Sequence, residues 1–149
     1  MSLDEEVDVL RRIPLFGNIE PAKLKLLAFT SERLTYDKGQ TLFRQGDMGD
    51  AAYIILEGDA DVIVSMPPGA PRKVAGLGRH DIIGEIAVLC DVPRTATVVA
   101  GSQLITLKIS KENFIRMITE FPQMGVEILR ELARRLEKTT QQLHAALNR

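Results

Sequence analysis

The stretch from Gly84 to Ala96 carries the residue types that could bind a phosphate group. Gly84 permits a tight turn and a close approach of the backbone. Residues 85–89 are long enough for one helical turn, whose first N–H groups lack intrahelical partners and attract anions. Arg94 follows Pro93, and its guanidinium group can bind two phosphate oxygens at once. The spacing therefore predicts a phosphate cradle in this stretch.

Glu85 is unexpected beside a phosphate site, because a carboxylate repels an anion. It makes sense if it accepts a hydrogen bond from a sugar hydroxyl and also offsets the charge of Arg94. A ligand that joins a phosphate to a neighbouring ribose hydroxyl meets both demands, and a 3′,5′-cyclic nucleotide has that arrangement. The two residues together predict a phosphate-plus-ribose site rather than a plain anion pocket.

Three zones of the chain would position this cradle. Residues 1–33 show the apolar spacing of helices, residues 34–109 are typical of short strands separated by turns, and residues 110–149 are helical again. A hairpin tip is expected at 67–69, where two prolines precede a glycine. We therefore predict one α+β domain over residues 1–149, an eight-stranded antiparallel jelly-roll β-barrel with N-terminal helices and a long C-terminal helix.

The last predicted helix begins after the break at Phe121-Pro122 and carries a stripe of leucines. The stripe has three- and four-residue spacing, a threonine fills one gap, and its members are Leu129, Leu132, Leu136, Thr139, Leu143 and Leu147. This heptad-like pattern favours a homodimer formed through the helix. The alternative is that the stripe covers the domain's own sheet.

Composition and charge argue against several classes of protein. The 149 residues are 45% hydrophobic, enough for one core, and the net charge of −1 does not favour direct nucleic-acid binding. No apolar run approaches the ~20 residues of a membrane helix, and the N-terminus lacks the features of a secretory signal, so we expect a cytoplasmic protein. Cys90, His80 and His144 form no ligand pattern in the sequence, so we expect no metal, no cofactor and no metal-dependent enzyme of the cupin type.

The pattern Gly84-Glu85-Ile86-Ala87 … Pro93-Arg94-Thr95-Ala96 resembles the phosphate-binding cassette of cyclic-nucleotide-binding domains. Such domains occur in protein kinase regulatory subunits, cyclic-nucleotide-gated channels and the catabolite activator protein family. The resemblance also includes motifs between Arg44 and Gly58 and covers essentially the whole chain. It implies a non-catalytic receptor for cAMP or cGMP that signals through movement of its C-terminal helix. The alternative is a degenerate domain of the same fold that serves in dimerisation or protein interaction without a nucleotide.

The resemblance implies a role for each residue of the cradle, and Gly84 would form the tight turn that opens it. Arg94 would hold the exocyclic phosphate oxygens, and Glu85 would accept the ribose 2′-hydroxyl. Backbone N–H groups of Ile86, Ala87 and Thr95 would complete the phosphate contacts.

The identity of the base depends on hydroxyl residues. In the catabolite activator protein family, hydroxyl groups on the closing helix reach adenine, one of them across the dimer, which makes Thr139 and Thr140 candidate base contacts; they could equally be a polar break in the stripe. A hydroxyl at Thr95 favours cGMP in eukaryotic kinases, whereas bacterial and channel domains often carry one and bind cAMP. We expect cAMP, with cGMP as the alternative. The 149 residues contain no helix-turn-helix of the kind that follows in transcription factors, so we expect no direct DNA contact.

Overall fold

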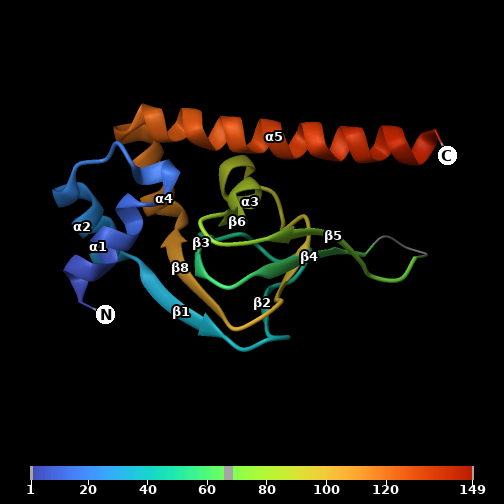
Figure 1. Ribbon diagram of the computed structural model, residues 1–149, viewed down its shortest axis with the longest axis horizontal. Coiled ribbons are helices and arrows are strands. Elements are labelled where there is room, and N and C mark those ends of the chain that lie inside the picture. Colours follow the sequence, from blue (N-terminus) through green and yellow to red (C-terminus); the bar gives the residue numbers. More distant parts are fainter. Residues whose placement is uncertain (1, 66–68, 149) are drawn as a thin grey trace.

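The computed structural model describes residues 2–65 and 69–148 (Figure 1). It begins with helices α1 (Leu3–Arg11), the 3₁₀ helix η1 (Pro14–Phe16) and α2 (Pro21–Thr30). The strands of the described chain are β1 (Glu32–Tyr36), β2 (Thr41–Phe43), β3 (Ala51–Glu57), β4 (Ala60–Val64), β5 (Arg72–Leu77), β6 (Ile82–Ile83), β7 (Thr97–Ala100) and β8 (Leu104–Ser110). Helix α3 (Glu85–Cys90) lies between β6 and β7, and α4 (Lys111–Glu120) and α5 (Pro122–Leu147) close the chain.

The helix boundaries follow the expected capping chemistry. Ser110 Oγ accepts a hydrogen bond from the backbone N–H of Asn113 at 3.2 Å and so caps α4, as a serine before a helix commonly does. Pro122 occupies the first turn of α5, where a missing N–H is tolerated, so the predicted break between the two helices is confirmed. The N-terminal zone ends slightly earlier than expected, because β1 already begins at Glu32.

The strands form two four-stranded antiparallel sheets, ordered β1-β8-β3-β6 and β2-β7-β4-β5. The predicted eight antiparallel strands are therefore present in the described chain, but they do not close into a barrel. Strand β6 has two residues before the chain turns away at Gly84 into α3, too few to continue pairing toward the other sheet. The chain around the predicted hairpin tip leads from β4 to its partner β5, while Pro67 and Pro68 lie outside the described residues.

The first sheet is covered on both faces, which explains why the first six residues of β3 are all buried. Ala52, Ile54 and Leu56 belong to a core shared with the helices, whereas Tyr53 and Ile55 belong to a second core between the two sheets. Successive strand residues point to opposite faces, so one continuous apolar run can serve both cores. Figure 1 shows α1, α2 and α4 gathered at one end of the molecule and α5 running along its length past α3.

The leucine stripe of α5 does not cover the sheets of its own chain. Leu132 packs against the helical core, but Leu129, Leu136, Leu143 and Leu147 are 66%, 68%, 60% and 75% exposed. All residues from 136 to 148 are exposed. The second half of α5 therefore has no packing partner within the described chain, and the stripe is available to another molecule. No helix among the described residues is long and apolar enough to cross a membrane.

Candidate functional site

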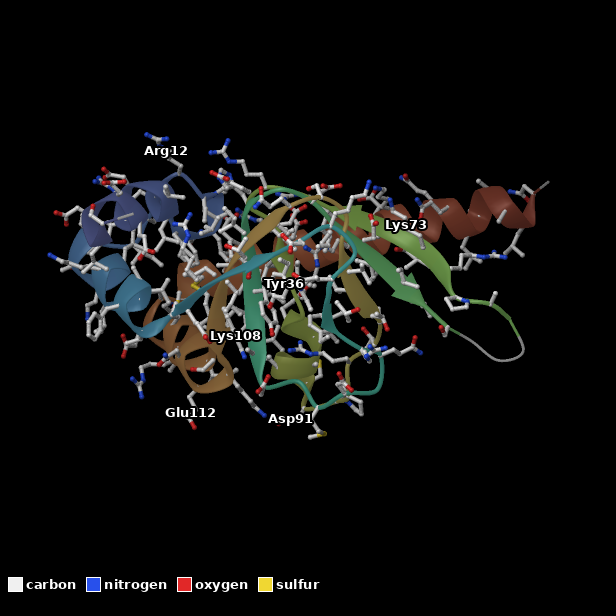
Figure 2. All side chains as sticks on the ribbon, turned by 90° about the horizontal axis from the view of Figure 1, so that it is seen from below. Arg12, Tyr36, Lys73, Asp91, Lys108 and Glu112 are labelled. Carbon is white, nitrogen blue, oxygen red and sulfur yellow. The ribbon has the colours of Figure 1, made fainter. Side chains whose placement is uncertain are left out.

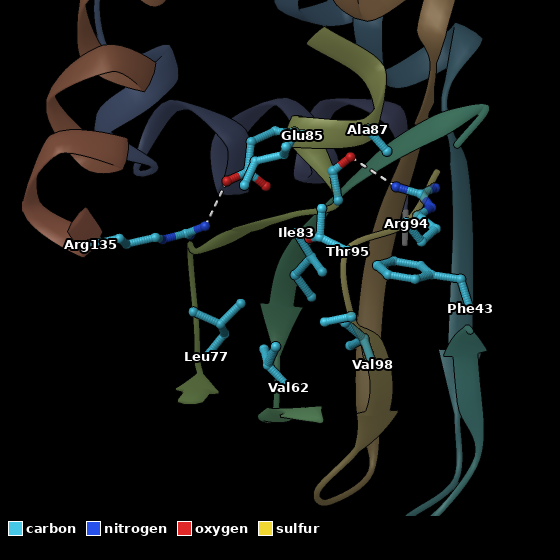
Figure 3. Close-up of a pocket in the computed structure, with 13 residues that line it drawn as sticks. Phe43, Val62, Leu77, Ile83, Glu85, Ala87, Arg94, Thr95, Val98 and Arg135 are labelled. Atoms are coloured by element: carbon cyan, nitrogen blue, oxygen red, sulfur yellow. Dashed lines mark hydrogen bonds and ion pairs between the residues drawn. The ribbon is translucent and has the colours of Figure 1, made fainter. Parts of the chain in front are cut away.

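A cavity of about 110 Å³ lies between the second sheet, α3 and α5 (Figure 3). The six residues predicted for the cradle all line it: Gly84, Glu85, Ile86, Ala87, Arg94 and Thr95. Its other walls are apolar side chains from the strands, together with one arginine from α5: Phe43, Val62, Leu77, Ile83, Ala96, Val98 and Arg135. The structure thus gathers the predicted residues around one cavity, with charged groups at its rim and an apolar wall opposite.

The turn into α3 is built by Gly84, which caps the helix with a φ of +79°. This left-handed conformation favours glycine, and a Cβ atom at this position would also overlap Nη1 of Arg94. Helix α3 then ends at Asp91, whose φ of +53° turns the chain back. Figure 2 shows Asp91 at the rim of the molecule, and Lys111 at the start of α4 pairs with it. Both ends of the short helix are therefore fixed to neighbouring elements.

Arg94 is 4% exposed, and its guanidinium group is held by main-chain oxygens. Nη1 donates to the carbonyl of Gly84 at 2.8 Å, and Nη2 donates to the carbonyl of Ala51 at 2.7 Å. The ring of Phe43 lies under the guanidinium, 4.0 Å from Cζ to the ring centroid (Figure 3). Burial lowers the pKa of Arg94, while the charges of Tyr53, Asp50, Asp47 and Glu85 act in the opposite direction.

The segment before β3 holds the cradle through its backbone. The N–H of Arg94 donates to the carbonyl of Asp47 at 2.7 Å, and the N–H of Gly46 donates to the carbonyl of Arg94 at 2.8 Å. Gly49 lies so close to Ala87 that a Cβ atom there would overlap the alanine side chain. The two sequence segments that resemble the family independently are therefore packed against each other.

Glu85 is 2% exposed, and its partner is an arginine of α5 rather than Arg94. Arg135 Nη1 donates to Glu85 Oε1 at 2.6 Å, and Nη2 donates to the carbonyl of Ile82 at 2.8 Å. Burial raises the pKa of Glu85, and Arg135 opposes this shift more strongly than Arg94 does. The predicted offset between Glu85 and Arg94 acts without a direct ion pair, and the direct partner of the carboxylate is Arg135, which α5 brings closer.

Arg135 is the functional residue that sequence reasoning missed. It sits among several charged residues of α5, and nothing in its spacing distinguishes it from Arg134, which is exposed and pairs with Glu131 on the same helix at 3.2 Å. The available signal was chemical rather than positional. A buried carboxylate requires a partner, and Arg94 is committed to two carbonyls.

Thr139 and Thr140 lie on the exposed part of α5 and do not line the cavity. Thr140 Oγ1 donates to the carbonyl of Leu136 at 2.8 Å, one turn earlier. Within one chain the structure does not bring these two hydroxyls to the cradle. Their predicted contact with a base stays a prediction, since one of them was expected to act across a dimer.

A larger cavity of about 330 Å³ lies between η1, the β5–β6 turn and α5. Two of its carboxylates, Glu127 and Glu131, already pair with arginines on α5 at 2.9 and 3.2 Å, and Asp81 accepts the N–H of Gly78 at 2.8 Å. No group of three or more metal-ligating side chains occurs among the described residues. The smaller cavity is the better candidate, because it combines a buried cation with the start of a helix and a buried carboxylate.

The fold and this cavity define a regulatory type of domain, in which two antiparallel sheets hold a buried cation beside the start of a short helix. Residues 33–121 match the family model described as cyclic nucleotide-binding domain, and the chain belongs to this family. It is 26% identical over 136 residues to a CRP-like cAMP-activated global transcriptional regulator of Mycobacterium tuberculosis, covering 91% of this chain and 61% of that relative. It is 36% identical over 109 residues to a cAMP-dependent protein kinase regulatory subunit of Blastocladiella emersonii, covering 73% of this chain and 27% of that subunit.

Solved structures agree with this assignment. The catabolite activator protein of Thermus thermophilus superposes with a TM-score of 0.75 at 29% identity, over 87% of this chain and 61% of that one. The chain thus spans about three fifths of the two regulators it resembles and about a quarter of the kinase subunit. What it shares with them is the cyclic-nucleotide-binding domain.

Proposed function

We propose that this domain is a non-catalytic receptor for a 3′,5′-cyclic nucleotide. The observation that carries the proposal is the Arg94 guanidinium, buried at the cavity wall and held by two carbonyls without an ion-pair partner among the described residues. Buried charges in proteins are normally paired. An anionic ligand at the start of α3 would supply the missing charge, with backbone N–H groups of Ile86, Ala87 and Thr95 beside it.

The charges around the cavity favour a singly charged phosphate. Its ionisable lining residues are Glu85, Arg94 and Arg135, which sum to +1. A cyclic phosphodiester carries one negative charge, whereas a phosphomonoester carries about −1.5 to −2 at pH 7. The ribose hydroxyl of the cyclic ligand would donate to the carboxylate of Glu85, which has acceptor sites besides the one used by Arg135.

The apolar wall formed by Val62, Leu77 and Val98 would receive the base. We propose cAMP as the preferred ligand and cGMP as the alternative. The names of the Mycobacterium and Blastocladiella relatives support cAMP. Thr95 is exposed at the rim of the cavity, where a hydroxyl is free to meet either base.

Ligand binding would be transmitted through α5. Arg135 joins this helix to Glu85, the residue proposed for the ribose, so occupancy of the site changes the surroundings of the helix. The cavity of about 110 Å³ is smaller than the ~300 Å³ of typical ligand pockets, so we infer that α5 adjusts when a nucleotide enters. The ligand can shift α5 only by its difference in affinity for the two arrangements.

We also propose that a second copy of the chain covers the exposed half of α5. Thirteen consecutive residues, 136–148, are exposed, and the twelve that end at Leu147 are helical without a packing partner among the described residues. Isolated helices of this length are marginal in water. A partner helix with the same leucine spacing would bury Leu136, Leu143 and Leu147 in a self-complementary interface.

Calorimetric titration of the chain with cAMP, cGMP and 5′-AMP tests the proposed function. We expect saturable binding of the cyclic nucleotides at micromolar concentration or below, and at least about tenfold weaker binding of 5′-AMP. Absence of binding by both cyclic nucleotides, checked by displacement of a fluorescent analogue, would favour a domain that keeps the fold for protein interaction alone.

A further inference from the structure

The Arg94 guanidinium is buried by groups that carry no negative charge. Two of its N–H bonds point at the carbonyls of Gly84 and Ala51, one face lies on the ring of Phe43, and Nε has no hydrogen-bond partner. Among the described residues it forms no ion pair, and Asp47 and Asp50 affect its pKa only from a distance. The cation is therefore positioned without being neutralised.

The ring of Phe43 is well placed to position the Arg94 guanidinium without neutralising its charge. The 4.0 Å separation between Arg94 Cζ and the ring centroid is well inside the ~6 Å range of cation–π attraction. Phe43 in turn contacts Tyr53, with ring centroids 5.8 Å apart, and Tyr53 itself lies 6.0 Å from the guanidinium. Because the ring attracts the flat face of the guanidinium, it uses none of the five N–H donors at the edge.

The guanidinium is closely surrounded and has little room to adopt another position. A Cβ atom on Gly84 would overlap Arg94 Nη1 and would lie 3.3 Å from Phe43 Cε2. The three residues come from β2, the turn before α3 and the loop after it, so separate elements converge on one group. A carboxylate in place of the ring would also hold the arginine, but it would occupy N–H donors and compete with an anionic ligand.

We propose that Phe43 is a positioning residue of the anion site. It holds the face of the Arg94 guanidinium, so that the N–H donors not used by the carbonyls of Gly84 and Ala51, and the full positive charge, stay available to the phosphate. The inference rests on the proposed function, because a phosphate is the anion it serves. The inference goes beyond the proposed function, because it assigns to Phe43, an apolar residue of β2, a share of the affinity for the phosphate.

The test compares Phe43→Leu, which keeps an apolar side chain without a ring, with Phe43→Tyr, which keeps the ring. We expect Phe43→Leu to weaken cAMP binding roughly 3- to 30-fold, the range of a cation–π contact, and Phe43→Tyr to stay within about twofold of wild type. The Arg94 Nε–Hε resonance in ¹⁵N-edited NMR, assigned by its loss in Arg94→Lys, reports the ring directly. In the ligand-free protein its ring-current shift should fall in Phe43→Leu to the smaller contribution of Tyr53, and it should persist in Phe43→Tyr.

The outcomes distinguish failure of the positioning role of Phe43 from failure of the proposed receptor function. A Phe43→Leu protein with unchanged affinity for cAMP would overturn the positioning role. Weaker affinity with an unchanged Arg94 resonance would overturn it too, because the loss would then come from the shape of the apolar wall. The same loss of affinity in an Arg94→Lys background would overturn it as well. A wild-type protein that binds no cyclic nucleotide would refute the proposed function, and the resonance would still decide whether Phe43 holds Arg94.

Discussion

Arg135 and Glu85 are 50 residues apart in sequence, and Arg135 Nη1 lies 2.6 Å from Glu85 Oε1. The carboxylate is buried in the cradle, and the arginine belongs to α5, just before the exposed residues 136–148 of the chain. A second hydrogen bond from the same guanidinium reaches the carbonyl of Ile82. One side chain therefore links the charge of the proposed ribose site to the position of the closing helix.

Replacing Arg135 by glutamine should destabilise the domain, because it leaves the buried Glu85 carboxylate without its cationic partner. We expect the free energy of unfolding to fall by about 1 to 3 kcal/mol, the cost of an unsatisfied buried group. Urea denaturation at neutral pH measures it. Arg134→Gln is the matched control one residue away, and its exposed pair with Glu131 should contribute no more than about 0.5 kcal/mol. Equal losses in the two variants would contradict the assigned link.

The titration of Glu85 should appear in the pH dependence of stability. Burial raises its pKa above the ordinary value of 4.5, against the opposing effect of Arg135. A raised folded-state pKa gives a stabilising contribution that is present below pH 4.5 and is lost as the pH rises through the folded-state value. The stability of the wild-type chain relative to Glu85→Gln should therefore decrease between pH 4 and neutrality. Denaturation curves at several pH values would contradict this if the relative stability increased instead.

The turn at Gly84 should tolerate no side chain. Gly84→Ala should cost about 1 to 3 kcal/mol from the backbone conformation alone, and it should weaken cyclic-nucleotide binding at least about tenfold because the Cβ displaces Arg94. Gly39→Ala is the matched control, since Gly39 has a φ of +91° but open space around it. Melting curves and titrations of both variants distinguish backbone strain from displacement of the arginine. Similar affinities in the two variants would refute the steric explanation.

The exposed stripe of α5 should mediate self-association. Leu136→Glu and Leu143→Glu should convert a dimer into a monomer while leaving the fold intact, because both side chains are at least 60% exposed in the single chain. Leu26→Glu on α2 changes an equally exposed leucine elsewhere and should leave the mass unchanged. Light scattering coupled to gel filtration measures the mass directly. A wild-type chain that stays monomeric at tens of micromolar would contradict the proposed interface.

Much of this architecture could be predicted from the sequence because the signals are local. The cap at Ser110, the break at Pro122 and the glycine turn at 84 each reflect the conformational preference of single residues, and all three are present. The residues predicted for the cradle line one cavity for the same reason, since they are close together in the chain. The family match over residues 33–121 confirms the resemblance on which the remaining assignments depend.

The features that could not be predicted are those made by distant segments. Closure of the barrel depends on how far strand pairing continues past β6, and no single residue encodes that. The partner of Glu85 depends on where α5 crosses the cradle, which places Arg135 rather than Arg134 against the carboxylate. Likewise, Phe43 is about 50 residues before Arg94 in the sequence, and only the fold places its ring on the guanidinium.

The most direct test of the central claim is a calorimetric titration with cAMP of the wild-type chain and Arg94→Gln in parallel. Arg79→Gln, which removes the same charge beside the larger cavity, serves as the control. We predict saturable binding to the wild type and to Arg79→Gln, and an affinity roughly 10- to 1,000-fold lower in Arg94→Gln, with its fold verified by circular dichroism. Equal affinity of the wild type and a folded Arg94→Gln protein would contradict the claim that Arg94 binds the phosphate.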